Sequence, residues 1–212
     1  MKTIILNGSP RKDWNTAQLL KSAQKGAESA GAAVEYFDLY DLTFTGCRSC
    51  LACKRKGIGE PCKCYYGDAL APIIDRIYMA DRLILGSPIY FGEPTGQLRM
   101  ALERIYFPAL SYNTFSSTFK GNLTVDVFLT MNCPQEVYEK AYSAKMEEYF
   151  GPFHLLNTAA RIHPIWDTVQ VSDYSKYDMD GIDGAAKQAR HDAEFPAALE
   201  LAFKIGAGTA EA

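Results

Sequence analysis

The chain has 212 residues, which is enough to bury the core of one α/β domain, and 48% of its residues are hydrophobic while 22% are charged. Its formal net charge of −3 argues against a protein that binds nucleic acid through a basic surface. The first apolar run covers only residues 4–6, too short for a signal-peptide core or a membrane span, so we expect a cytoplasmic protein with no membrane partner.

Short apolar runs alternate with amphipathic stretches along the chain. The first run predicts a buried strand at residues 2–6, and the turn-rich sequence NGSPRKDWNT separates it from a helix that begins near Asn15 or Thr16. This alternation predicts a parallel, doubly wound sheet in one domain, 1–212, with a cysteine-rich insertion at about 46–64. Further strands are predicted at 34–39, 82–88, 123–130 and within 160–171, and further helices at 68–80, 95–106, 134–150 and 184–206, with Pro196 starting or kinking the last one.

The triplet Gly-Ser-Pro occurs twice, at residues 8–10 after the first predicted strand and at residues 86–88 after the third. In a sheet of order 2-1-3-4-5 these two strands are neighbours, and their carboxyl ends flank the point where the strand order reverses. Ligands of such sheets bind in the crevice at that point. The sequence therefore predicts that both turns face one ligand-binding crevice.

The first turn has the residues of a phosphate site. It leads into a helix, whose first backbone N–H groups and dipole favour an anion. Neither GxGxxG nor GxxxxGK[ST] is present, so a monophosphate suits the turn better than a pyrophosphate or a nucleoside triphosphate. Asp13 would repel a phosphate unless its carboxylate points away. Four side chains can donate hydrogen bonds to the phosphate: Ser9, Arg11, Asn15 and Thr16.

The second turn lies in the sequence SPIYFGEPTG and suits a flat heteroaromatic ring. It offers the rings of Tyr90 and Phe91 and backbone amides held by glycine and proline residues. Taken singly, each turn is also compatible with a plain structural role, as a helix cap or as core packing. A phosphate pocket beside a slot for a flat ring, however, describes FMN.

The segments NGSPRKDWNT and GSPIYFGEPTGQLRMALER resemble the two flavin-binding segments of the flavodoxin-like NADPH-dependent FMN reductase family. The resemblance is greatest to the branch of iron-sulfur flavoproteins, which carry clustered cysteines after the second strand. It implies a flavodoxin-like three-layer fold with a five-stranded parallel sheet. It also implies that Ser9, Arg11, Asn15 and Thr16 hold the FMN phosphate, that Pro88, Ile89, Tyr90, Phe91 and Gly92 line the isoalloxazine, and that Thr130, Met131, Asn132 and Cys133 give the third flavin contact.

Five of the six cysteines lie in GCRSCLACKRKGIGEPCKC, residues 46–64. The C-x2-C-x2-C spacing lets three sulfurs converge on one ion or cluster, and a fourth thiolate would complete a 4Fe-4S or zinc site. The resemblance favours iron and sulfur, whereas the long gap after the third cysteine favours uncomplexed thiols or a thiol pair that exchanges with a disulfide. The candidate ligands are Cys47, Cys50 and Cys53, with Cys62 or Cys64 as the fourth.

The resemblance implies an FMN-dependent oxidoreductase that takes a hydride from NADPH or NADH and passes electrons to a quinone, free flavin, or another small or protein acceptor. This chemistry requires no general base, so the sequence names no catalytic residue. Two alternatives remain, namely an iron-sulfur flavoprotein electron carrier with little NAD(P)H turnover and a domain that has lost its flavin. A homo-oligomer is expected from the resemblance and from the aromatic loop at 107–119.

Overall fold

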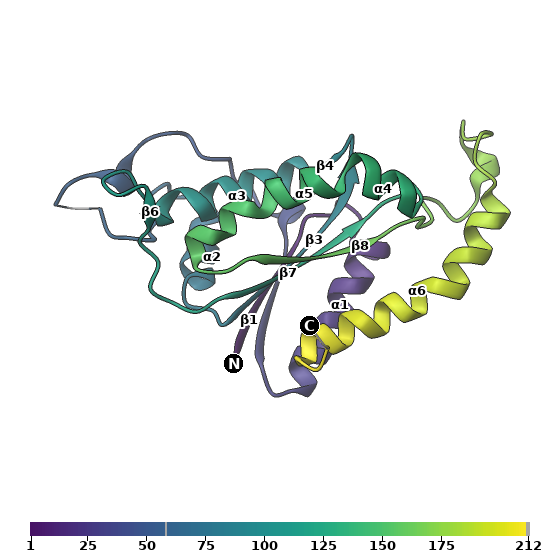
Figure 1. The fold of residues 1–212 in the computed structure, drawn as a ribbon, viewed down its shortest axis with the longest axis horizontal. Helices are drawn as coiled ribbons and strands as arrows, with labels where there is room; N and C mark the ends of the chain where they lie inside the picture. Colours follow the sequence, from purple (N-terminus) through teal and green to yellow (C-terminus); the bar gives the residue numbers. More distant parts are fainter. Residues whose placement is uncertain (58, 211–212) are drawn as a thin grey trace.

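The computed structural model describes residues 1–57 and 59–210, and it shows three layers with a parallel sheet in the middle (Figure 1). Within these residues the sheet order is β2-β1-β3-β7-β8, with each neighbouring pair parallel. This arrangement confirms the predicted flavodoxin-like fold. The five strands are β1 (Lys2–Asn7), β2 (Ala33–Asp38), β3 (Arg82–Tyr90), β7 (Thr124–Thr130) and β8 (Ala160–Ile165).

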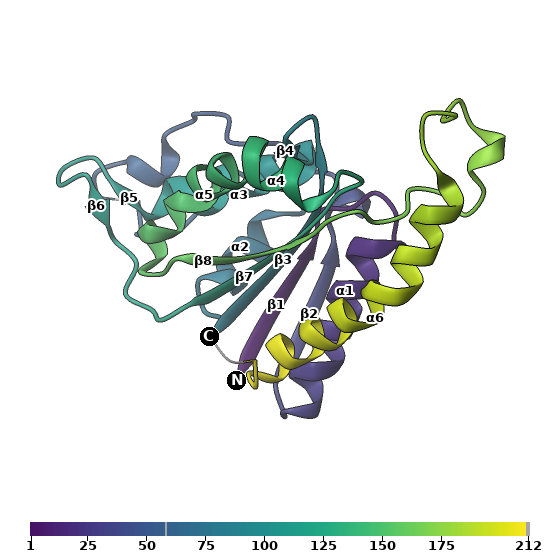
Figure 2. The same ribbon diagram turned by 45° about the vertical axis from the view of Figure 1, so that its right-hand side comes forward.

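Helices cover both faces of the sheet, which explains why its central strands are apolar on both sides. Helices α1 (Asn15–Ser29) and α6 (Gly184–Ala207) lie on one face (Figure 2). The other face is covered by α2 (Ala71–Ile77), α3 (Gly96–Ala109), α4 (Gln135–Ala141) and α5 (Ser143–Phe150). Accordingly Ile4 and Leu6 are buried in the core under α2 and α3, while Ile5 is buried under α1 and α6.

Two glycines allow α1 and α6 to cross in close contact. A Cβ atom on Gly206 would lie 1.9 Å from the Ala23 carbonyl oxygen, and one on Gly26 would lie 2.0 Å from the Phe203 carbonyl oxygen. Only residues without a side chain fit between these backbones. The crossing fixes the carboxyl-terminal half of α6 against the body of the domain.

The structure differs from the sequence predictions in two places. The helix predicted at 134–150 is divided into α4 and α5, because Tyr142 leaves helical geometry at φ −127° and places its ring against Gly92. The aromatic loop contains a short hairpin, β5 (Leu110–Ser111) with β6 (Ser116–Ser117). The helix predicted at 184–206 is confirmed as α6, which begins at Gly184 after a cap at Asp183 and runs through Pro196, so Pro196 does not start it.

Two further strand residues, β4 (Glu93–Pro94), pair antiparallel with the end of β3 and turn the chain back toward α3. In the part of the chain that the structure describes, none of the helices combines the length and the apolar character needed to cross a membrane.

Candidate functional site

The two Gly-Ser-Pro turns are joined directly by hydrogen bonds. The Gly8 N–H donates to the Gly86 carbonyl at 2.8 Å, and the Thr95 hydroxyl donates to the Gly8 carbonyl at 2.6 Å. Close packing requires both glycines, because a Cβ on Gly8 would lie 2.9 Å from the Gly86 oxygen and one on Gly86 would lie 2.7 Å from Leu20. The carboxyl ends of β1 and β3 therefore meet at one point, as the sheet order predicts.

A cleft of about 160 Å³ opens at this point. It brings together most of the residues predicted to bind a flavin, including residues from all three predicted segments. Phe91, Gly92 and Cys133 are not among its lining residues: the Phe91 side chain is fully exposed, Gly92 packs against Tyr142, and Cys133 lines a neighbouring pocket. The predicted residues that line the cleft are Ser9, Arg11, Asn15, Thr16, Pro88, Ile89, Tyr90, Thr130, Met131 and Asn132.

The first turn presents an anion-compatible surface. Asp13 points away and pairs with Lys21 at 2.7 Å, a hydrogen bond that lowers the pKa of the Asp13 carboxyl. Helix α1 has no side-chain cap among the described residues and no acidic residue in its first turn. The Thr16 and Thr130 hydroxyls lie 2.7 Å apart, so this pair joins α1 to the end of β7. The positive end of α1 is thus directed into the cleft.

The chain segment after β8 forms a wall of the cleft that sequence analysis missed. The Trp14 indole N–H and the Asn15 side-chain amide both donate to the Val169 carbonyl, at 2.9 and 2.7 Å, and the Arg11 guanidinium donates to the Gln170 carbonyl. Two predicted phosphate donors therefore hold this segment in place. No motif marks residues 168–170, and only the fold brings them to the first turn.

One polar atom in the cleft lacks a partner. The Asn132 Oδ1 atom is buried and has no hydrogen-bond partner among the described residues, although the Asn132 carbonyl accepts a bond from Lys187. A buried amide oxygen without a hydrogen-bond partner destabilises the folded protein, and a ring N–H of a bound heterocycle could donate the missing hydrogen bond. With the ring of Tyr90 and the apolar side chain of Ile89 on the opposite segment, the cleft fits FMN chemically.

The cysteine loop lies against the other end of α3. Cys47, Cys50, Cys53 and Cys64 line one narrow pocket of about 20 Å³ beside Phe107. Phe107 is twelve residues after Thr95, which at 1.5 Å per residue places the pocket about 18 Å along the helix from the two turns. The thiol pocket and the cleft are therefore separate sites on one helix.

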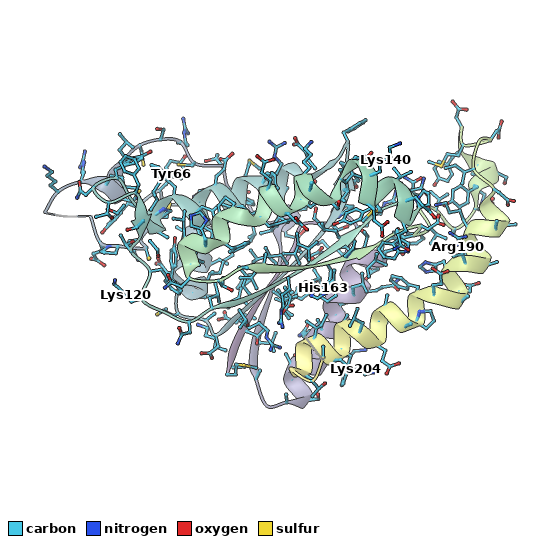
Figure 3. The ribbon with its side chains drawn as sticks, viewed as in Figure 1. Tyr66, Lys120, Lys140, His163, Arg190 and Lys204 are labelled. Carbon is cyan, nitrogen blue, oxygen red and sulfur yellow. The ribbon has the colours of Figure 1, made fainter. Side chains whose placement is uncertain are left out.

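Arg104, one of the largest fully buried side chains, anchors the cysteine loop to α3. Its guanidinium pairs with Asp68 and donates to the Tyr66 carbonyl at 2.8 Å and to the Cys64 sulfur at 3.4 Å. Tyr66 is labelled at this end of the molecule in Figure 3. Arg104 also donates to the Thr45 carbonyl at 3.2 Å, so its bonds tie both ends of the loop to α3.

The sulfurs do not form a metal-binding set in this arrangement. Among residues 1–57 and 59–210, no three His, Cys, Asp or Glu side chains are placed to hold a metal ion. Cys62 lies apart from the other predicted ligands, with its sulfur 3.8 Å from the Thr118 hydroxyl. Burial raises the pKa of the Cys53 and Cys62 thiols, which favours the protonated form. The loop as folded therefore fits neither a 4Fe-4S cluster nor zinc.

The chain is similar to known proteins in both sequence and structure. Two curated relatives are iron-sulfur flavoproteins, one from Methanocaldococcus jannaschii, 36% identical over 104 residues (49% of this chain, 51% of the relative), and one from Archaeoglobus fulgidus, 28% identical over 137 residues (65% and 59%). The chain thus matches only about half the length of these relatives.

Solved structures share the fold over nearly the whole chain. An NAD(P)H:quinone oxidoreductase from Methanothermobacter marburgensis has a TM-score of 0.74 at 16% identity, covering 99% of both chains. An FMN-dependent NADH-azoreductase from Bacillus anthracis, solved with FMN, has a TM-score of 0.64 at 14% identity, covering 97% of this chain and 100% of that one. Residues 1–121, more than half of the chain, match the family of NADPH-dependent FMN reductases. The resemblance inferred from the two turn sequences is thereby confirmed, and the chain belongs to the NADPH-dependent FMN reductase family.

Proposed function

We propose that the protein binds FMN in the cleft between the two Gly-Ser-Pro turns and catalyses electron transfer from NADPH or NADH to an acceptor. The observation that carries this proposal is the convergence of Ser9, Tyr90 and Asn132, from three separate βα connections, on one cleft. Family membership supports the same function.

The residues of the cleft have distinct tasks. The amino-terminal end of α1, with the Ser9 and Thr16 hydroxyls and the Arg11 charge, binds the phosphate. Tyr90 and Ile89 contact the ring, and the Asn132 Oδ1 atom accepts a ring N–H. FMN supplies the redox chemistry, because it accepts a hydride and releases electrons one or two at a time.

The size of the cleft sets how donor and acceptor reach the cofactor. Sites that bury a ligand of this size usually enclose about 300 Å³ or more. At about 160 Å³ the cleft leaves part of the flavin accessible, on the side where Tyr90 and Phe91 are exposed. Donor and acceptor then bind in turn at this exposed side, and the protein orients them without a general base.

The test is a pair of measurements on one preparation. FMN titration followed by flavin fluorescence should give a one-to-one complex, and the complex should oxidise NADPH or NADH when a quinone or free flavin is supplied. A protein that binds FMN but oxidises neither nucleotide would contradict the reductase function. A protein that binds no FMN would contradict the assignment of the cleft.

An electron carrier with little NAD(P)H turnover is a second candidate. Its support is that the relatives are named iron-sulfur flavoproteins and that Cys47, Cys50, Cys53 and Cys64 share a pocket wall. Because the sulfurs as folded do not fit a cluster, we assign no electron-transfer step to a cluster. Iron and sulfide analysis of anaerobically purified protein decides between the candidates, together with the rate of reduction by ferredoxin. Stoichiometric iron and sulfide with a negligible NADPH rate would favour the carrier.

A further inference from the structure

A second cavity, of about 320 Å³, lies on the other side of the segment that follows β8. It separates the end of this edge strand from the middle of α6. Most of its lining is apolar, and its only lining residue in common with the flavin cleft is Thr168. Side chains from the strand end and from the helix face each other across it: Ile165 and Trp166 on one side, and Phe195, Ala198 and Leu201 on the other.

The fold holds this cavity open from both ends of α6. The carboxyl-terminal half of the helix is fixed by the crossing of Gly206 with α1. Near its amino terminus, Lys187 and Arg190 both pair with Asp167, which follows β8. Figure 3 labels Arg190 on α6 where the helix passes the end of β8. Because both ends are tied, the middle of α6 cannot move onto the strand to close the space.

One polar group in this apolar lining lacks a partner. The His191 ring stacks on Phe195 with centroids 4.4 Å apart and planes at 21°, and its Nδ1 atom is buried without a hydrogen-bond partner among the described residues. Burial lowers the pKa of His191, so the ring is neutral near pH 7. A neutral imidazole nitrogen can accept a hydrogen bond or donate one, according to its tautomer.

The charges at the rim cancel one another. Arg190 pairs with Asp167 and approaches Glu194 at 4.0 Å, so the charged side chains among the described lining residues already face partners of opposite charge. The volume falls in the range of about 300–1,000 Å³ that small-molecule sites have. The ligand that suits this lining is neutral, flat and apolar except for one hydrogen-bonding group.

We propose that this cavity binds a neutral planar aromatic molecule with a single hydroxyl group, of the phenol or naphthol class, with its ring against Trp166 and Phe195 and its hydroxyl at His191 Nδ1. A hydroxyl group matches either tautomer of the histidine, because it both donates and accepts. The site is distinct from the flavin cleft and does not depend on the proposed function.

The test uses 2-naphthol and isothermal titration calorimetry on the full chain, with and without saturating FMN. Wild-type protein should bind one 2-naphthol, with the same affinity in both conditions. Ala198→Phe fills the cavity and should abolish binding, whereas Ala193→Phe, the same change at an exposed position of α6, should bind like wild type. His191→Phe keeps the stacked ring but removes the nitrogen, and should weaken binding about five- to tenfold.

Three results would overturn the proposal. Wild-type protein that binds no 2-naphthol would show that the cavity takes no such ligand. Loss of binding when FMN is added would show that the probe sits in the flavin cleft. A dimer in sedimentation velocity that Ala198→Phe converts to a monomer, while Ala193→Phe does not, would show that the cavity is a subunit interface. Thermal unfolding of each variant establishes that it is folded before the affinities are compared.

Discussion

At the scale of single residues, Arg11 is a cation that lines the cleft beside the predicted phosphate-binding turn, although its guanidinium also donates to the Gln170 carbonyl. Arg11→Ala should weaken FMN binding by about 1.5–3 kcal/mol, the value of a hydrogen bond to a charged group. Lys12→Ala is the matched control, because Lys12 pairs with Asp41 and does not line the cleft. Fluorescence titration with FMN measures both affinities. Equal affinities for the two variants would show that Arg11 does not bind the phosphate.

Asp126 is a buried carboxylate whose charge stabilises the fold. It accepts hydrogen bonds from His163 at 2.9 Å and from Arg161 at 2.8 Å, on the face of the sheet that α1 and α6 cover. Figure 3 labels His163 on β8. Burial opposes ionisation, but these two bonds prevail and lower the pKa of Asp126 below its ordinary value of 3.8.

Asp126→Asn should therefore destabilise the protein at pH 7 by about 1–3 kcal/mol. A lowered carboxyl pKa contributes stability above the unfolded-state pKa and loses it as the pH falls through the folded-state pKa. The difference between wild type and variant should consequently be smaller at pH 3 than at pH 5. Urea unfolding across this range measures it, and a difference that grows with acid would contradict the assignment.

The sequence predicts the two turns of the site, because the Gly-Ser-Pro triplet occurs after two strands that are neighbours in the sheet. Other residues of the site are not predicted by a motif. The resemblance implies that Phe91 lines the isoalloxazine ring, yet the backbone of Phe91, with φ of 52°, turns its side chain to solvent. Residues 168–170 carry no motif, and the carbonyl oxygens they contribute belong to every residue, so only the fold could identify them.

At the scale of elements, the crossing of α1 and α6 depends on two glycines. Gly206→Ala would place a methyl group 1.9 Å from a backbone oxygen, so the helices must separate. We expect a loss of about 1–3 kcal/mol in the free energy of unfolding, as for other overpacked cores. Gly96→Ala, in the first turn of α3 with open space around it, should be neutral or slightly stabilising. Thermal and urea unfolding compare the two, and similar losses would contradict the packing argument.

The strands were predicted well because both faces of the sheet are buried and their sequences are apolar throughout, as in β1 and β3. The connections were predicted less well, because tertiary contacts decide them. Tyr142 ends one helix and starts another where its ring meets Gly92, a residue fifty positions earlier. Pro196 lies inside α6, where the helix already has a cap at Asp183 and a long packed face.

At the scale of the whole molecule, we propose that the aromatic hairpin β5–β6 joins two copies of the chain. The side chains of Tyr112 and Phe115 are 53% and 77% exposed and in edge contact with each other. Replacing both with serine should convert a dimer into a monomer in sedimentation velocity. Tyr177→Ser, at a similarly exposed position near the start of α6, is the control. A wild-type monomer at all concentrations, or a double variant that still dimerises, would contradict this interface.

The separation of the cysteine loop from the flavin cleft leads to the last prediction. Cys47 and Cys50 are exposed, and the pocket they line begins on α3 at Arg104, about 14 Å along the helix from Thr95, which ties the two turns together. Because the thiol pocket and the cleft have no lining residue in common in the described part of the chain, Cys47→Ser combined with Cys50→Ser should leave the FMN dissociation constant within about twofold of wild type. Arg11→Ala, measured in the same titration, shows how much FMN affinity is lost when a predicted phosphate-binding residue is removed. A tenfold weaker FMN affinity in the cysteine variant would mean that the loop and the cleft are energetically coupled through α3.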